Sequence, residues 1–551
     1  MLAQSLRPIT KSSSDRVSRI LIVLGALGMV ACLVIGVPRN AGPDEAQHIA
    51  RGAALVRGQL NGEPDSPPSP YVWFTLPWWI GQPDPACYAF NPTQTAGCAS
   101  VHQPTGALTI RWLSKTGSYP PTAHILAGLA TLLPGGAATS WIARLLNAAI
   151  PVGVILMALR CVLSDPRRRW LGAGVLIALN PAVWFFVAVV NPSGWLAAGS
   201  LAMWAATVSR PEDPTTVNNR AWLFAIGFSL ATLARFDGLA FSVVVLVLAT
   251  LWGTSGMLSQ IVRAKAPLVV MTGAAIINAG WTVHYGQRQW LFGGRGLEVA
   301  TLTIGIVGLV AVVRSSRLLR AVDRLRCAAV DRPLLIAALF PAVPTAIFFL
   351  QSESRHFPYA ASVGNTGESI LEGIGVLGWV DTRIPETAFF LQLMAIGLIV
   401  GLAVLVGGHH RKALLVATCF LVVSLQWFLQ MSLTYWHGRY LFSLTVGIPL
   451  MAASIVGDST VAAMGQRAGT LIGATTWVVW NLGFAQTIRR FAVGSVGVMD
   501  PTAWDNYETF VSKSILLAAF AACSGALVAG VLLGTTDRHP PSNRSAPING
   551  V

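Results

Sequence analysis

One short polar segment carries residue types that could transfer a proton or bind a metal ion. Asp44, Glu45, His48 and Arg51 follow the first apolar segment of the chain. Pro43 suits the first turn of a helix, and the helix dipole favours acidic side chains there. If Pro43 opens a helix, Asp44, His48 and Arg51 share one face, because they lie three or four positions apart. An acid-capped helix at a membrane surface would explain the same residues without any chemistry.

The composition identifies the kind of protein that must position these residues. The chain has 551 residues, of which 54% are hydrophobic and 11% charged, and its mean hydropathy is +0.60. Soluble domains carry roughly a quarter charged residues, so the sequence predicts a membrane protein with many spans. The net charge of +15 comes from basic residues in short loops between apolar segments. This pattern predicts topology and a lipid-bilayer partner, and it gives no reason to expect nucleic acid.

The basic loops fix the predicted fold, an all-α polytopic membrane protein of about fourteen transmembrane helices. Residues 1–19 form a cytoplasmic N-terminus, and residues 20–534 form the transmembrane domain. Within that domain we expect a first extracytoplasmic loop with interfacial helices at 38–138 and a second large outer loop at 351–386. The tail 535–551 is expected to be disordered in the cytoplasm. Among the loops placed inside, 314–332 is the most basic.

The seven cysteines indicate one disulfide bond. Cys87 and Cys98 lie in a polar, proline-rich part of the first outer loop, whereas the other five lie in or beside apolar segments. We predict that Cys87 and Cys98 are joined, since an extracytoplasmic loop is exposed to an oxidising compartment.

The predicted topology also gathers other polar side chains at the outer membrane face. They are Tyr119, His124, Asn191, Arg235, Asp237, His437, Arg439 and Tyr440. Ionisable residues near membrane depth are expensive and usually functional, and arginine can hold a phosphate with two parallel hydrogen bonds. Each residue also has a simpler explanation. Arg235 and Asp237 could pair with each other, and Arg439 could anchor its helix at the lipid headgroups.

Several short motifs, in this order, resemble the GT-C superfamily of membrane glycosyltransferases. The closest likeness is to a bacterial branch known only as predicted membrane proteins of unknown function. The motifs are Pro43-Asp44-Glu45 with His48, Asn191-Pro192, Gly378-Trp379-Val380-Asp381-Thr382 with Pro385, and Gly438-Arg439-Tyr440. The resemblance covers most of the chain as an order of features, and each motif alone is short.

The resemblance implies that a sugar is transferred from a polyprenyl-phosphate donor on the outer side of a bacterial plasma membrane. Asp44 would be the catalytic carboxylate with Glu45 as its lesser neighbour, and Asp44 with His48 could hold a divalent cation (Mg, Mn or Ca). Arg439, or else Arg235, would bind the donor phosphate. Because the chain has no recognisable soluble middle domain or large C-terminal carbohydrate-binding domain, the expected acceptor is a cell-wall or surface glycan.

Two other classes of function remain open at this point. A transporter or flippase of a lipid-linked sugar would explain the spans and the outer charges, although transporters usually carry polar residues at the midplane on broken helices. A non-catalytic scaffold would tolerate replacement of Asp44. Measured turnover of a polyprenyl-phosphate sugar separates the enzyme from both.

Overall fold

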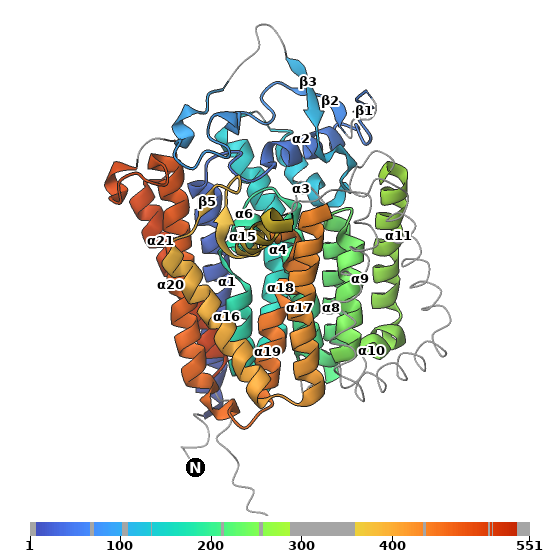
Figure 1. Cartoon of the computed structure of the whole chain (residues 1–551), viewed down its shortest axis with the longest axis vertical. Helices are drawn as coiled ribbons and strands as arrows, with labels where there is room; N and C mark the ends of the chain where they lie inside the picture. Colours follow the sequence, from blue (N-terminus) through green and yellow to red (C-terminus); the bar gives the residue numbers. More distant parts are fainter. Residues whose placement is uncertain are drawn as a thin grey trace, which may run out of the picture.

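The structure is a computed structural model that describes residues 7–66, 71–101, 108–133, 135–210, 214–252, 257–286, 359–432, 437–504, 507, 509 and 511–536. These residues form a long bundle of helices with a smaller polar cap at one end (Figure 1). The described parts of the predicted outer loop 38–138 build most of the cap. The apolar segments 300–313 and 333–350, which we count among the fourteen expected spans, the basic loop 314–332 and nearly all of the tail lie outside the described residues.

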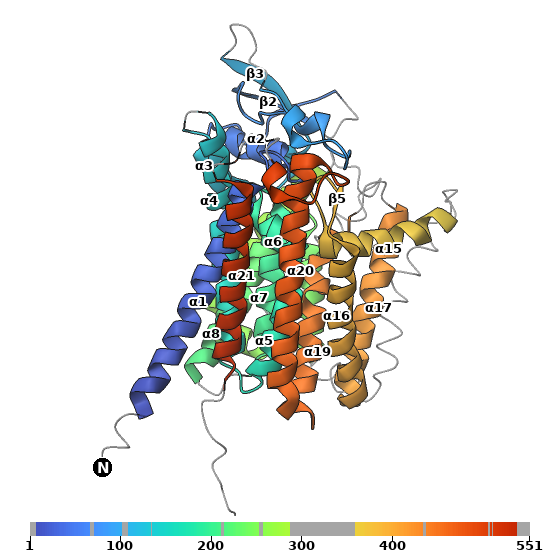
Figure 2. The same cartoon turned by 90° about the vertical axis from the view of Figure 1, so that its left-hand side faces the viewer.

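The bundle consists of helices that run mostly along the long axis of the molecule (Figures 1 and 2). The helices are α1 (Arg7–Gly36), α4 (Ala137–Leu163), α5 (Arg168–Ala178), α6 (Pro181–Ala188), α7 (Pro192–Val208), α8 (Pro214–Ala234), α9 (Gly238–Trp252), α10 (Met257–Ala264), α11 (Ala266–Gly286), α15 (Tyr359–Gly375), α16 (Glu386–Val406), α17 (His409–Ser432), α18 (Phe442–Thr445), α19 (Gly447–Gly457), α20 (Gly465–Val493) and α21 (Lys513–Gly534). In Figure 2, α15 crosses the cap-side ends of α16 and α17 instead of running beside them.

The bundle is organised around α7, which the other helices enclose. All 17 of its residues are buried, and it packs against α4 and α8. A helix that is apolar on every side must be surrounded by other helices or by lipid. Because α7 begins at Pro192 beneath the cap, its first turn also lies next to the acidic segment that precedes α2.

The cap contains two helices and a small sheet. The sequence predicts interfacial helices in this loop, but it does not predict the sheet. The helices are α2 (Glu45–Leu55) and α3 (Thr122–Ala130), and the antiparallel strands are β1 (Glu63–Pro64), β2 (Val72–Pro77) and β3 (Thr109–Ser114). Val72, Phe74 and Leu76 alternate toward the interior of the cap, as a half-buried strand requires. Short 3-10 helices complete the described chain, and they are η1 (Pro85–Cys87), η2 (Ala96–Cys98), η3 (Thr116–Ser118), η5 (Gly438–Leu441), η6 (Ala462–Met464) and η7 (Pro501–Ala503).

The structure supports a multi-pass membrane protein but not fourteen spans. Five described helices are long and apolar enough to cross a membrane, or six if α5 and α6 form one bent span. The apolar segment 170–190, which counts as one of the fourteen expected spans, is bent by 65° between these two helices, where the Asn180 side chain caps α6 and Pro181 begins it. Other predicted spans are short helices such as α7, whose 17 residues extend about 25 Å against a hydrocarbon core of about 30 Å.

Both described ends of the chain lie at the end of the bundle opposite the cap (Figure 2). The hydroxyl of Ser18 in α1 donates a hydrogen bond to the carbonyl of Gly530 in α21, at 2.7 Å. Arg168, the first residue of α5 in the basic turn where this helix begins, donates to the carbonyl of Thr536 at 2.9 Å. The two ends and this basic turn therefore share one side, as the positive-inside pattern requires.

Candidate functional site

A polar layer lies where the cap meets the bundle. It receives side chains from the start of α2, the segment before α3, α3 itself, the turn after α8 and η5. We call these residues the junction cluster, and they are Asp44, His48, Tyr119, His124, Arg235, Asp237, His437, Arg439 and Tyr440. Ring contacts, hydrogen bonds and electrostatic interactions connect them to one another. Most of the predicted site residues thus come together, although they are spread over much of the sequence.

Asp44 is the carboxylate of the cluster that no partner neutralises directly. The helix was expected to open at Pro43, but it begins at Glu45, and Asp44 is its N-cap residue with φ 55° and ψ 17°. This left-handed conformation is uncommon for a residue other than glycine. The Asp44 side chain neither caps the helix nor makes a hydrogen bond or ion pair with any described residue. It is partly exposed, and it acts electrostatically on Tyr119 and His437.

His48 and His124 form a buried hydrogen-bonded pair whose proton positions follow from their partners. His124 Nδ1 lies 3.1 Å from the Pro120 carbonyl, which can only accept, so His124 Nε2 carries no proton. His48 Nδ1 lies 3.0 Å from that nitrogen and must donate to it. The Nε2 atom of neutral His48 is therefore left as an acceptor. Burial lowers the pKa of His124 to about 3, and burial, His124 and the nearby arginines lower that of His48 as well.

A close contact between α2 and α3 sets the geometry of this histidine pair. A Cβ atom on Gly52 would lie 2.5 Å from the His124 carbonyl oxygen, and one on Gly128 would lie 2.2 Å from the Gly52 carbonyl oxygen. Real Cβ contacts are never this short, so the two backbones can meet only through glycine. The contact begins one helical turn after His48, and it holds α3 near enough for the two imidazoles to bond.

Two arginines and Tyr440 form the basic part of the cluster. The Arg235 guanidinium carbon lies 3.9 Å from the centre of the Tyr440 ring, and that of Arg439 lies 5.0 Å from it. Arg235 makes two hydrogen bonds to Asp237, so the predicted alternative of a local ion pair is present. Arg439 is 5% exposed, and its one polar contact is a 3.4 Å hydrogen bond to the Tyr440 hydroxyl. Among the described residues, no carboxylate pairs with Arg439.

Glu372 of α15 belongs beside this cluster, and the sequence analysis missed it. One of its carboxylate oxygens lies 3.1 Å from His437 Nδ1 and accepts the Gly438 amide at the same distance. Burial and the neighbouring Arg439 lower the pKa of His437 despite this carboxylate. Glu372 thus fixes the start of η5, which carries Arg439. No sequence motif marks it, since it lies in a helix of unremarkable pattern.

Glu45 is paired with a buried arginine, and its predicted role as a second catalytic acid stays a prediction. Both of its carboxylate oxygens lie 2.7 Å from guanidinium nitrogens of Arg144, and they also accept the amides of Gly42 and Val190. Glu45 and Arg144 are both fully buried. This carboxylate therefore holds the cap against α4. Arg144 was also missed, although a charged residue inside an apolar helix is itself a signal.

Arg51 and Asn191 likewise serve to hold the structure together. Arg51 is fully buried, donates to the Leu60 carbonyl at 2.8 Å and lies over the rings of Phe74 and Trp281. The Asn191 side chain caps α7 through the Ser193 amide and donates to the Pro43 carbonyl at 2.9 Å. Asn191 therefore fixes the backbone immediately before Asp44.

Comparison with known families gives one broad result. The profile of the family described as "Predicted membrane protein (DUF2142)" matches residues 27–448, which includes the entire junction cluster. The chain belongs to the DUF2142 family. This membership shows a membrane protein and leaves its chemistry open.

One curated protein resembles this DUF2142 chain at low identity. Apolipoprotein N-acyltransferase of Prochlorococcus marinus (strain MIT 9313) is 25% identical over 274 residues, which cover 43% of this chain and 52% of that protein. The chain thus spans about half the length of this relative. No solved structure matches the chain significantly.

The Gly378 to Thr382 motif of this DUF2142 chain forms a hairpin that is connected to the cap through a buried arginine. Strands β4 (Val376–Leu377) and β5 (Thr382–Arg383) pair across a turn in which Gly378 and Val380 have positive φ. Asp381 accepts from buried Arg490 at 2.7 Å, and Arg490 also donates to three carbonyls in the 88–94 segment. Beside that segment, Cys87 and Cys98 form the predicted disulfide. The motif is therefore structural.

The cluster does not form a preorganised metal site. Among the described residues, no group of three or more His, Cys, Asp or Glu side chains could hold a metal ion. Asp44 and His48 Nε2 supply two donors, and the arginines close to His48 disfavour a further cation. We derive no chemical step through a metal. The expected dependence on Mg, Mn or Ca stays a prediction that chelation would test.

Proposed function

We propose that this protein is a GT-C-type membrane glycosyltransferase that uses a polyprenyl-phosphate sugar as its donor. One observation carries the proposal. Within the described part of the chain, Asp44 is a carboxylate with no direct partner and Arg439 is a buried guanidinium with no acidic partner, and both belong to one polar cluster beneath the cap. Burying an unpaired charge is expensive, so buried Arg439 is best explained by a substrate that carries an anionic group, and partly exposed Asp44 is accessible to the same substrate.

Asp44 is the general base in this proposal. The acceptor hydroxyl gives its proton to the Asp44 carboxylate while its oxygen forms a bond to the anomeric carbon of the donor sugar. The bond between that carbon and the phosphate oxygen breaks, and its electron pair stays on the lipid phosphate. Carboxylates supply this kind of proton transfer in enzymes, and the absence of an ion pair keeps Asp44 available.

Arg439 stabilises the leaving group. The phosphate gains negative charge as the glycosidic bond breaks, and a guanidinium can hold two of its oxygens at once. Arg439 lies at the start of η5, near the end of the bundle where a lipid phosphate would stand. Arg235 adds positive charge, although Asp237 already occupies part of its guanidinium. Arg439 is therefore the principal phosphate ligand.

His48 positions the acceptor. Its lowered pKa keeps the ring neutral, so its Nε2 atom can accept a hydrogen bond from a sugar hydroxyl. The same lowered pKa makes His48 a weaker base than an ordinary histidine. Tyr119 is in edge contact with the His48 ring and supports that position.

We propose that the protein lies in a bacterial plasma membrane with the cap outside and both termini in the cytoplasm. This placement is supported by the basic turn at the end of the bundle opposite the cap and by the disulfide within the cap. The acceptor, a cell-wall or surface glycan, would then reach the cluster from water while the donor lipid stays in the bilayer.

Acyl transfer is the second candidate, and the similarity to the Prochlorococcus protein favours it. One assay tests both candidate functions. Purified protein in nanodiscs is incubated with a panel of polyprenyl-phosphate sugars and, separately, with phospholipid acyl donors. Release of polyprenyl phosphate supports glycosyl transfer, whereas release of lysophospholipid supports acyl transfer. Turnover of neither donor together with movement of the lipid-linked sugar across the bilayer would indicate a flippase.

A further inference from the structure

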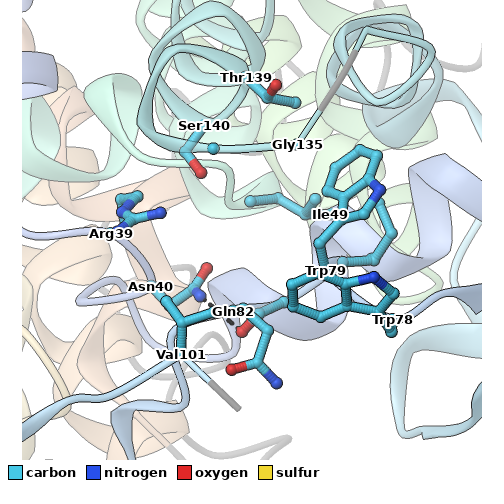
Figure 3. Close-up of a pocket in the computed structure, with 13 residues that line it drawn as sticks. Arg39, Asn40, Ile49, Trp78, Trp79, Gln82, Val101, Gly135, Thr139 and Ser140 are labelled. Carbon is cyan, nitrogen blue, oxygen red and sulfur yellow. Dashed lines mark hydrogen bonds between the residues drawn. The ribbon is translucent and has the colours of Figure 1, made fainter. Parts of the chain in front are cut away.

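A pocket opens in the cap beside α2, and Ile49 of this helix lines it. Its volume is about 240 Å³, and its lining includes Asn40, Ile49, Trp78, Trp79 and Ser140 (Figure 3). None of the residues that line this pocket belongs to the junction cluster. This Trp pocket is therefore separate from the junction cluster, although both adjoin the same helix.

The Trp pocket contains polar groups that no described residue satisfies. The indole N–H groups of Trp78 and Trp79 and the hydroxyl of Ser140 have no hydrogen-bond partner within the described part of the chain. Asn40 is 2% exposed, and its Nδ2 donates to the carbonyls of Gly81 and Pro83. The Asn40 Oδ1 atom is buried and accepts nothing from the described residues. An ordered water is one common partner of a buried polar atom in this state.

Sugars match this set of groups better than other ligands do. A pyranose ring offers a flat C–H face that can pack on an indole, and its hydroxyls both donate and accept hydrogen bonds. The pocket is large enough to admit a single sugar ring. Arg39 is the one cationic side chain in the lining, so a neutral ligand fits the pocket well.

We propose that the Trp pocket binds one neutral sugar unit of the acceptor glycan, at a distance from the hydroxyl that reacts. This inference rests on the proposed function, because it takes the acceptor to be a glycan. A polymer held here by one unit and presented to Asp44 by another would be retained near the site between encounters. The pocket would act on acceptor affinity and not on the chemical step.

The test measures binding of neutral trisaccharides of glucose, mannose, galactose and N-acetylglucosamine to the purified full-length protein. Saturation-transfer NMR is suitable, in a detergent without a sugar headgroup, since such a headgroup would compete. We expect at least one trisaccharide to bind with a Kd of about 1 mM or lower. Trp78→Ala should weaken it about tenfold or more, and Ser140→Ala, which removes one hydroxyl, about two- to tenfold.

Matched controls separate this inference from the proposed function. Trp477→Phe alters a Trp of α20 whose indole donates to Ala521, so it should bind sugar like the native protein. Asp44→Asn should also bind normally while losing turnover. The inference is overturned if no trisaccharide binds, or if Trp78→Ala and Ser140→Ala both bind at native affinity. Pocket-dependent binding alongside native turnover by Asp44→Asn would instead contradict the proposed function.

Discussion

At the scale of single residues, the adjacent acids Asp44 and Glu45 have different surroundings. Glu45 is enclosed by Arg144 and two backbone amides, whereas Asp44 faces the cluster with no direct partner. The sequence indicates that this acidic pair matters, and position alone favours Asp44. The sequence cannot reveal the partner of Glu45, because Arg144 lies 99 residues further along the chain. Local patterns show which residue types are present, and only the fold shows which are already neutralised.

Arg439 gives a prediction about donor binding. Arg439→Lys keeps the positive charge but loses the planar fork that can hold two phosphate oxygens. We expect the affinity for a polyprenyl-phosphate sugar to fall about tenfold or more, which is about 1.4 kcal/mol, while the Tm changes little. Equilibrium binding of a labelled donor measures the effect, with Arg411→Lys at the far end of the bundle as the control. Native donor affinity in Arg439→Lys would place the phosphate site elsewhere.

The histidine pair gives a prediction about pH. The pKa of His124 is about 3 in the folded protein, because of burial and Arg51, against 6.5 for a free histidine. At a pH between about 3 and 6.5, His124 binds more protons in the unfolded chain than in the folded one. The free energy of unfolding should therefore fall as the pH drops below 6.5, by up to about 1.4 kcal/mol per pH unit. His124→Gln should show a weaker decline of Tm with acid, and exposed His409→Gln should behave as native. Parallel Tm curves for His124→Gln and native protein would rule this out.

At the scale of elements, the presence of helices was easier to predict than their ends and contacts. The predicted interfacial helix 122–133 is close to α3, and several apolar segments correspond to helices such as α9 and α17. The start of α2 was misplaced because Asp44 adopts a left-handed cap conformation, which helical spacing does not reveal. Strand β2 shows no clear alternation in its sequence, because Trp73 between buried Val72 and Phe74 is itself apolar.

The α2–α3 contact gives a prediction at this scale. Gly52→Ala would place a methyl group 2.5 Å from the His124 carbonyl oxygen, and backbone cannot yield as a side chain can. We expect α3 to move away, the His48–His124 bond to break, and both the Tm and the turnover to fall. Gly153→Ala in α4 is the matched control, since nothing lies within 4 Å of its added Cβ. If Gly52→Ala keeps native Tm and turnover, close helix contact does not position the histidines.

At the scale of the whole molecule, hydropathy identified a helical membrane protein and overcounted its spans. A hydropathy window detects apolar segments but cannot separate a helix exposed to lipid from one enclosed by other helices, as α7 is. A hydropathy window also cannot reveal hydrogen bonds between segments that lie far apart in the sequence. Arg490 of α20 joins the cap at residues almost 400 positions earlier in the chain, and such a contact has no local signature.

We predict that the cap faces the outside of the cell and that the opposite end of the bundle faces the cytoplasm. A cysteine at Leu108, which is 85% exposed in the cap, should react with a membrane-impermeant thiol reagent applied to intact cells. A cysteine at Met464, 62% exposed in the turn that precedes α20 at the other end, should react only after the cells are opened. The reverse labelling pattern would place the junction cluster in the cytoplasm, away from an outer glycan acceptor.

The single-turnover rate of donor cleavage by Asp44→Asn tests most directly the claim that Asp44 is the base for sugar transfer. We expect a rate about 10²- to 10⁴-fold below native with an unchanged Tm, because the Asp44 side chain makes no hydrogen bond or ion pair with any described residue. Glu45→Gln, which leaves Arg144 buried and unpaired, should instead lose about 3 to 5 kcal/mol of stability. A near-native rate for Asp44→Asn, with a folded but inactive Glu45→Gln, would contradict the claim.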